Sequence, residues 1–144
     1  MKQELVTHSI AKYLPILVMK HVSDDTQDKE PPSLQNMETV AMFSDISGFT
    51  SISETVGKMG ARGAEDLVFC INRYMEGLVK CIEKFGGDII KFVGDAMIVC
   101  FPRPTTESLL TTVRKAIKCA LEIQKELNDK QIMQNVSKLS VKVK

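Results

Sequence analysis

Two aspartates stand where their carboxylates could take part in chemistry. Asp45 follows an apolar run that predicts a strand, and Asp95 stands with Gly94 between two further short apolar runs. If the first strand lies beside the other two, both carboxylates converge at one end of a sheet. Mg²⁺ takes one or two protein carboxylates and fills its remaining positions with water and substrate phosphates. Two such ions can activate an attacking oxygen and stabilise a leaving one, so the pair indicates phosphoryl chemistry.

The residues directly after Asp45 are suited to an anion. They read as a glycine turn followed by the start of a helix, where several backbone N–H groups can point toward a phosphate chain. This segment is Ile46, Ser47, Gly48, Phe49 and Thr50. Lys91 stands four residues before Asp95, and strand alternation places it on the face opposite its two chain neighbours. A lysine in that position is either solvated or directed at a ligand.

Each of these residues also has a plainer interpretation. Asp45 could be a turn or helix-capping residue and Asp95 a hairpin turn residue, since both uses of Asp beside Gly are common. Lys91 taken alone favours an exposed lysine. The pair Gly86 and Gly87 is more typical of a helix stop than of a phosphate loop.

Hydrophobic periodicity predicts the elements that position these residues. Strands are predicted at 38–44, 88–93, 96–101 and 139–144, and the two residues between the second and third predict a tight hairpin. Helices are expected at 49–56, from Leu67 to Phe85 and from Leu109 to Leu127, with a glycine-containing loop at 58–63. The order strand, helix, helix, strand, strand, helix, strand (β-α-α-β-β-α-β) predicts an α+β fold. Its helices should pack on one face of the sheet, as in a ferredoxin-like core.

The first part of the chain reads differently from the rest. Apolar residues from Ile10 to Val22 have helical spacing, and Pro15 predicts a break or kink within that helix. Residues 23–36 are polar and contain two prolines, which is typical of a solvated connector. We therefore expect an N-terminal helix and linker at 1–36 and the main body at 37–144.

Composition excludes several classes of protein. The chain has 144 residues, 44% hydrophobic and 26% charged, which is ordinary for one soluble domain. A formal net charge of +1 gives no general attraction to nucleic acid, and no apolar run approaches the roughly 20 residues of a membrane span. The four cysteines form no C-x-x-C pair, and the N-terminus has no secretory signal pattern. These features favour reduced thiols in the cytoplasm.

Two segments together resemble a specific family. DISGFT at 45–50 and FGGDIIKFVGDAM at 85–97 are similar to the two metal-site motifs of the class III nucleotide cyclases. Within that family the resemblance is greatest to the first catalytic domain of the soluble, bicarbonate-responsive adenylyl cyclases, and it covers roughly 38–144. It implies a ferredoxin-like cyclase core whose C-terminal half is missing. It also implies synthesis of cyclic AMP and pyrophosphate from ATP when the chain is paired with a complementary cyclase domain.

The resemblance also implies roles for single residues. Asp45 and Asp95 would bind two Mg²⁺ or Mn²⁺ ions, and the Ile46 carbonyl would ligate one of them. The backbone from Ser47 to Thr50 would hold the triphosphate. Lys91 matches a lysine near the nucleotide and the bicarbonate-binding region, so bicarbonate enters as an activator by resemblance alone.

The match leaves other readings open. The groups of the family's partner domain that stabilise the transition state have no counterpart here, so we expect negligible turnover from the isolated chain. One alternative is a catalytically inactive cyclase half-domain that binds a partner protein through its sheet edge. Another is a ferredoxin-like binding domain in which both aspartates are turn residues. ATP is preferred over GTP by resemblance only, as is a cilium or flagellum within the cytoplasmic assignment.

Overall fold

The computed structural model describes residues 14–23, 34, 36–129 and 139–144, and divides into the units Met1–Glu38 and Thr39–Lys144. The first unit contains the helix α2, Ile16–Ser23. The Pro15 carbonyl accepts the Met19 N–H at 3.0 Å, so the described helix begins directly after Pro15, where the sequence predicts a break. Proline is tolerated there because the first N–H groups of a helix have no intrahelical partner. Residues 10–13 of the predicted helix, and most of the predicted linker, lie outside the described residues.

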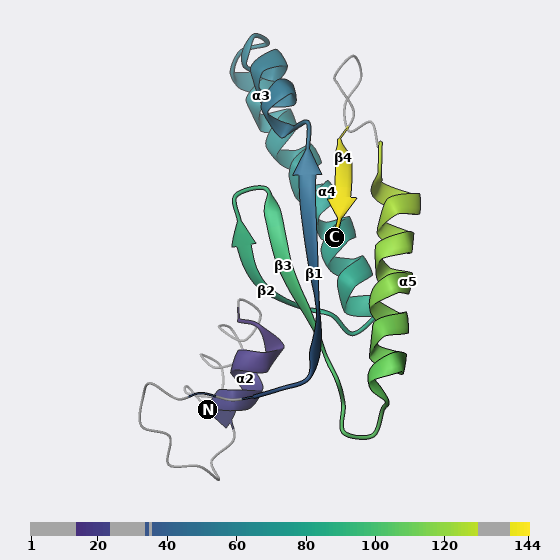
Figure 1. The fold of residues 1–144 in the computed structure, drawn as a ribbon. Coiled ribbons are helices and arrows are strands. Elements are labelled where there is room, and N and C mark those ends of the chain that lie inside the picture. The colour runs from purple at the N-terminus through teal and green to yellow at the C-terminus, as the bar shows by residue number, and fades with distance from the viewer. Residues whose placement is uncertain (1–13, 24–33, 35, 130–138) are drawn as a thin grey trace. The chain divides into compact units, whose positions relative to one another are not determined.

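The second unit is built on a four-stranded antiparallel sheet (Figure 1). Its strands are β1 (Thr39–Ser47), β2 (Asp88–Val93), β3 (Ala96–Pro102) and β4 (Ser140–Val143), in the spatial order β2-β3-β1-β4. All four predicted strands are present. β1 continues past its predicted end at residue 44, because residues 45–47 pair with β4 in addition to the pairing of Asp45 with β3.

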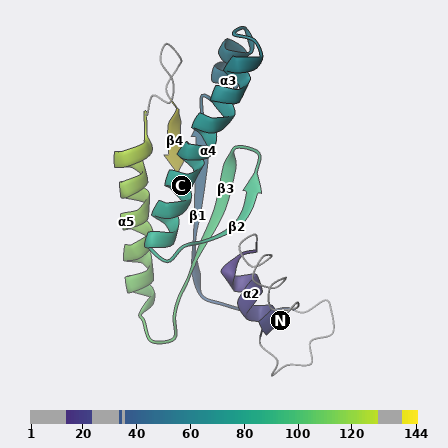
Figure 2. The same ribbon diagram turned by 180° about the vertical axis from the view of Figure 1, so that it is seen from behind.

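Two helices, α4 (Ala61–Lys84) and α5 (Leu109–Leu127), lie on one face of this sheet, as the two opposite views show (Figures 1 and 2). The shorter helix α3 (Phe49–Gly57) lies beyond the end of β1 and packs against α4. Alternation along β1 and β3 directs one set of side chains into the core beneath the helices. The buried strand residues of this core are Met42, Ile46, Met97, Val99, Phe101 and, from β4, Val141. The predicted α+β fold with helices on one face is confirmed.

The predicted loop at 58–63 is wrong in its second half, because α4 begins at Ala61. Gly60 precedes the helix with φ 77°, a positive value that glycine adopts without strain. Gly63 is buried inside the first turn of α4, and a Cβ there would stand 2.8 Å from the Met59 Cβ. This glycine therefore permits close packing between the α3–α4 connection and α4 and does not break a helix.

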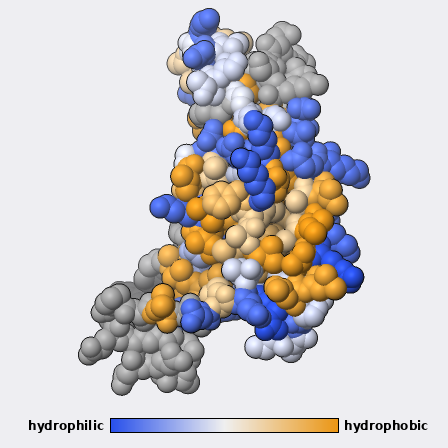
Figure 3. All heavy atoms as spheres, in the orientation of Figure 1, coloured by the Kyte–Doolittle hydropathy of each residue, from blue (hydrophilic) through white to orange (hydrophobic). Residues whose placement is uncertain are grey.

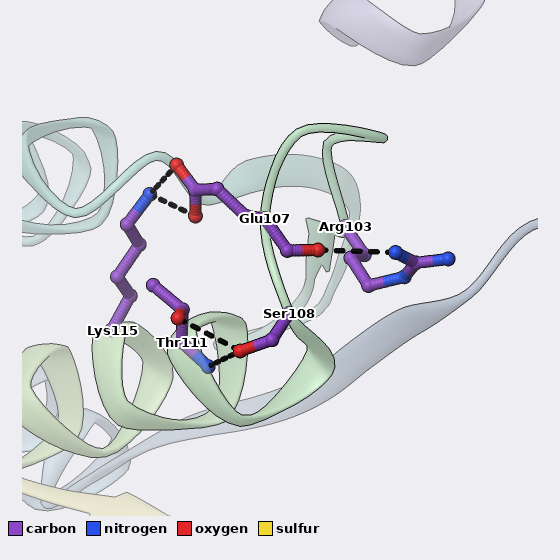
Figure 4. Close-up of polar contacts among 5 residues, drawn as sticks. All are labelled: Arg103, Glu107, Ser108, Thr111 and Lys115. Atoms are coloured by element: carbon purple, nitrogen blue, oxygen red, sulfur yellow. Dashed lines mark hydrogen bonds and ion pairs between the residues drawn. The ribbon is translucent and has the colours of Figure 1, made fainter.

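The connection from β3 to α5 follows the end of β3 remote from the hairpin, and Figure 4 shows the polar contacts within it. Arg103 donates to the Glu107 carbonyl at 3.0 Å, and the Lys115 ammonium lies 2.7 Å from both Glu107 carboxylate oxygens. The Ser108 hydroxyl accepts the Thr111 N–H at 3.2 Å and caps the start of α5. These contacts hold the connection in place.

Tyr74 joins α4 to the end of α5. Its buried hydroxyl donates to the Leu127 carbonyl at 2.9 Å, and burial raises the pKa of Tyr74 to about 12. We expect Tyr74→Phe to lower the free energy of unfolding by about 1 to 2 kcal/mol, because it leaves a carbonyl without its partner.

The raised pKa of Tyr74 also sets a pH dependence. The folded state holds the phenol proton more tightly than the unfolded chain, so this contribution is complete below pH 10.0 and is lost as pH rises through about 12. Urea unfolding at neutral and alkaline pH should therefore show a steeper alkaline loss in the wild type than in Tyr74→Phe. If the two proteins lose the same free energy of unfolding as the pH rises, Tyr74 is not the source of this pH dependence.

Candidate active site

The structure brings Asp45 and Asp95 together at one corner of the sheet. Asp45 on β1 lies opposite Ala96, the residue after Asp95, and the Ile46 N–H donates to the Asp95 carbonyl at 3.4 Å. Asp95 is exposed in the two-residue turn between β2 and β3. Gly94, the first residue of this turn, has φ 64°, which is the conformation that a type II′ hairpin turn requires at that position.

Asp45 belongs to the sheet face opposite the helices. Its neighbours Ser44 and Ile46 are 0% and 5% exposed beneath the helices, so alternation puts the half-buried Asp45 on the other face. We call this the open face, because no described element of this unit covers it. Its residues include Phe43, Asp45, Lys91, Val93, Ile98 and Lys142. Figure 3 shows apolar side chains gathered over the sheet in this view, with hydrophilic ones beside them.

The Ile46 backbone is directed at the hairpin tip. The N–H and C=O of one strand residue point to the same neighbouring strand. Because the Ile46 N–H donates to Asp95, its carbonyl also faces the β3 side, while its side chain is buried. A carbonyl oxygen therefore joins the two carboxylates at this corner.

The segment after β1 places the start of a helix next to the aspartates. Ser47 ends β1 opposite Ser140, and Gly48 occupies the N-cap position of α3 with φ 99°, so glycine avoids strain there. No side chain caps this helix start, and its first turn carries no acidic residue. The first N–H groups of α3, beginning at Phe49 and Thr50, are thus available to an anion.

Lys91 is farther from Asp45 than the other predicted residues. It is exposed on β2 opposite Ile98, and Ile98 lies opposite Phe43, so β3 separates it from β1. Two strand spacings amount to roughly 10 Å. The structure therefore puts Lys91 on the same face as Asp45 but not beside it.

Lys142 also lies at this corner, although the sequence alone does not single it out. It lies on β4 directly opposite Asp45 and is exposed. Residues opposite one another in an antiparallel pair have Cβ atoms about 4.5 to 5.5 Å apart on one face. The alternation in LSVKVK shows that Lys142 shares a face with Lys144, but only the register with β1 brings it to the aspartates.

The donor set at this corner fits a hard divalent cation. Within the described ranges no group of three or more His, Cys, Asp or Glu residues forms a complete metal cage. Two carboxylates and a carbonyl leave positions for water and phosphate oxygens, which is how Mg²⁺ is usually bound.

No helix in the described part of the chain is long and apolar enough to cross a membrane.

Comparison with known proteins adds independent findings. The family described as "Adenylate and Guanylate cyclase catalytic domain" matches residues 33–144. "Adenylate cyclase type 10" from Rattus norvegicus is 35% identical over 150 residues, which cover 99% of this chain and 9% of the relative. The chain thus spans less than a tenth of that relative's length.

Solved structures agree with the sequence match. The adenylyl cyclase CyaB from P. aeruginosa has a TM-score of 0.57 and 30% identity, over 74% of this chain and 56% of that one. The guanylyl cyclase Cya2 has a TM-score of 0.53 and 26% identity, over 76% of this chain and 55% of that one. The chain therefore belongs to the family of adenylate and guanylate cyclase catalytic domains.

Proposed function

We propose that this chain supplies the metal-ion half of an adenylyl cyclase active site, which converts ATP to cyclic AMP and pyrophosphate when a complementary cyclase domain completes it. The observation that carries the proposal is the backbone contact between Ile46 and Asp95, which joins the two aspartates at one corner. Membership of the cyclase family and the similarity to adenylate cyclase type 10 support the reaction class.

Asp45, Asp95 and the Ile46 carbonyl are the groups that would hold two Mg²⁺ or Mn²⁺ ions. When bound, the ions would make the ribose 3′-hydroxyl a better nucleophile and neutralise charge on the departing pyrophosphate. The protein fixes the positions of these oxygens on the ends of two paired strands, so they need little reorganisation during the reaction.

The triphosphate would lie against the start of α3 and Lys142. The backbone from Ser47 to Thr50 offers N–H groups at the positive end of a helix dipole. Lys142 adds a full positive charge opposite Asp45. Lys91, farther along the open face, is suited to a more distant part of the nucleotide or to bicarbonate acting as an activator.

The complementary domain would cover the open face beside this corner. Phe43 is 49% and Val93 50% exposed, and both lie on the open face, Phe43 two residues before Asp45 and Val93 across β3 from it. A contiguous apolar surface next to polar site residues is typical of a protein interface. An inactive interaction module is not favoured, because the aspartate pair and the uncapped helix start are both present.

The proposal also includes a cellular location and a preferred nucleotide. Cys70, Cys81, Cys100 and Cys119 are free thiols, which supports the cytoplasm, while a cilium or flagellum rests on the resemblance alone. ATP is proposed over GTP because the type 10 relatives are adenylate cyclases, although the similar solved structures include guanylyl cyclases.

A complementation assay tests the proposed function. The chain would be mixed with the second catalytic domain of a soluble adenylyl cyclase, and cyclic nucleotide formation measured with ATP or GTP and Mg²⁺ or Mn²⁺. We expect cyclic AMP from the mixture and negligible amounts from either component alone. Robust synthesis by the chain alone would contradict the half-site, and equal rates with GTP would contradict the proposed substrate.

Lys142→Ala is expected to weaken nucleotide binding in the same mixture. Loss of one exposed charge on the triphosphate should raise the KM for ATP by about tenfold, with a smaller change in kcat. Lys144→Ala is the matched control, because Lys144 lies opposite Phe43, two residues along β1 from Asp45. Equal KM values in the two variants would exclude Lys142 from the phosphate site.

A further inference from the structure

Cys81 on α4 and Cys119 on α5 contact one another, and neither has a part in the proposed active site. The Cys81 thiol donates to the Cys119 carbonyl at 3.9 Å, and the Cys119 thiol donates to the Cys81 carbonyl at 3.8 Å. Cys81 is 9% exposed and Cys119 is fully buried. The reciprocal contacts mean that both sulfur atoms lie between the two helix backbones.

The local packing of α4 and α5 brings their backbones close at this point. The helices are antiparallel, because Tyr74 reaches Leu127 while Cys81 reaches Cys119. Gly77, one turn before Cys81, has no side chain, and a Cβ there would stand 3.3 Å from the Leu127 side chain. Small residues at a crossing allow short distances between helices, which is what a bridge between two cysteines requires.

A groove on the outer side of the helix pair gives access to Cys81. It has a volume of about 280 Å³ and opens between α4 and α5. Gly77, Cys81 and Leu127 line it, and the remaining lining residues are charged: Lys80, Lys84, Glu122 and Glu126. Lys84 and Glu122 form an ion pair of 2.7 Å across it. A small polar oxidant can therefore reach the first sulfur without unfolding of the domain.

We propose that Cys81 and Cys119 form a redox-active dithiol, which a peroxide oxidises to an intramolecular disulfide that joins α4 to α5. The Cys81 sulfur attacks one peroxide oxygen, the O–O bond breaks and water leaves, which gives a sulfenic acid on Cys81. The Cys119 sulfur then attacks the Cys81 sulfur and displaces a second water. Two thiols and one hydrogen peroxide thus become one disulfide and two waters, and both thiol protons end in the waters.

The surroundings make this reaction slow at neutral pH. Burial raises the pKa of both thiols, that of Cys119 to about 12, and the Glu122 carboxylate raises both further. For Cys81, Glu126 acts in the same direction, while Lys84 lowers the pKa. Because the thiolate is the attacking species, the rate of oxidation should increase with pH.

The disulfide would close a loop between residues 38 apart in the chain. A loop of this length limits the freedom of the unfolded chain, so the folded-to-unfolded ratio should increase by roughly 10²- to 10³-fold. The bridge would fix the helix layer that supports the sheet.

The experiment uses Cys70→Ser/Cys100→Ser, which keeps only the two proposed partners. The folded protein is treated with hydrogen peroxide, and intact mass and a non-reducing peptide map are recorded. We expect a monomer that has lost two hydrogen atoms and a peptide that links Cys81 to Cys119. The urea midpoint of unfolding should be higher after oxidation and should fall to its original value when the disulfide is reduced. Unchanged thiols, sulfinic acid on Cys81, or linkage only in denaturant would overturn the proposal.

Single variants separate the dithiol from general oxidation. Cys81→Ala and Cys119→Ala, each in the wild-type background and checked for folding by circular dichroism, should form no intramolecular bridge. Cys70 lies 11 residues before Cys81, roughly 16 Å along α4, and so should not replace it. An intramolecular disulfide that persists in Cys81→Ala would show that another pair reacts.

Discussion

Asp95→Ala is expected to lower cyclic AMP synthesis in the complemented enzyme by about 10³-fold or more. The variant removes one of the two carboxylates at the corner of the sheet, and loss of a charge-stabilising group of this kind costs several kcal/mol of transition-state stabilisation. Because Asp95 is exposed in a hairpin turn, its side chain contributes little to the stability of the fold. The rate would be measured with saturating ATP and Mg²⁺ after mixing with the complementary domain.

Two further variants make this result specific. Asp45→Ala should cause a similar loss, and the double variant should be little worse than either single one, because residues that act as a unit are not additive. Asp66→Ala is the matched control, since Asp66 is an exposed carboxylate on α4 and lies outside the site. If Asp95→Ala has nearly the same activity as the folded wild type in the same assay, the proposed site is refuted.

Phe101→Ala is expected to lower the free energy of unfolding by about 3 to 5 kcal/mol. Phe101 is 1% exposed on β3 beneath the helices, and its ring lies so close to Gly87 that a Cβ there would stand 2.9 Å from it. The smaller side chain would leave a cavity in a core that cannot close around it. Urea unfolding followed by circular dichroism measures the loss.

Phe43→Ala is the matched comparison, because Phe43 is on the adjacent strand but faces away from the helices and is 49% exposed. We expect it to cost about 1 kcal/mol or less in unfolding. Its main effect should be weaker pairing with the complementary domain, seen as a higher concentration needed for half-maximal cyclic AMP synthesis. Equal destabilisation by the two variants would show that the open face is not free in the isolated unit.

Local patterns were sufficient for most of the fold. Alternation predicted the strands, and the two-residue spacing at Gly94 and Asp95 predicted the hairpin that the structure contains. The errors occur where side-chain packing or strand pairing decides the local structure. Gly63 looks like a loop residue but is required by the close approach of Met59, and β1 is longer than predicted because residues 45–47 pair with β4.

The candidate site was predictable to the same extent. Asp45 and Asp95 could be proposed as a pair from their positions, but their adjacency depends on β1 lying beside β3. Lys91 was prominent in sequence because it is near Asp95 in the chain, whereas the sheet separates it from Asp45 by a strand. Lys142, which is 97 residues after Asp45, becomes a neighbour only through the register of β4.

The most direct test of the metal half-site is an NMR titration of the chain with substoichiometric Mn²⁺. Because Mn²⁺ broadens nearby signals, the account predicts selective loss of the amide signals of Asp45, Ile46 and Asp95 in the presence of ATP. The signal of Asp66 should persist, and the selective broadening should disappear in Asp95→Ala. Broadening centred elsewhere, or broadening at the same amides that survives in Asp95→Ala, would contradict the central claim.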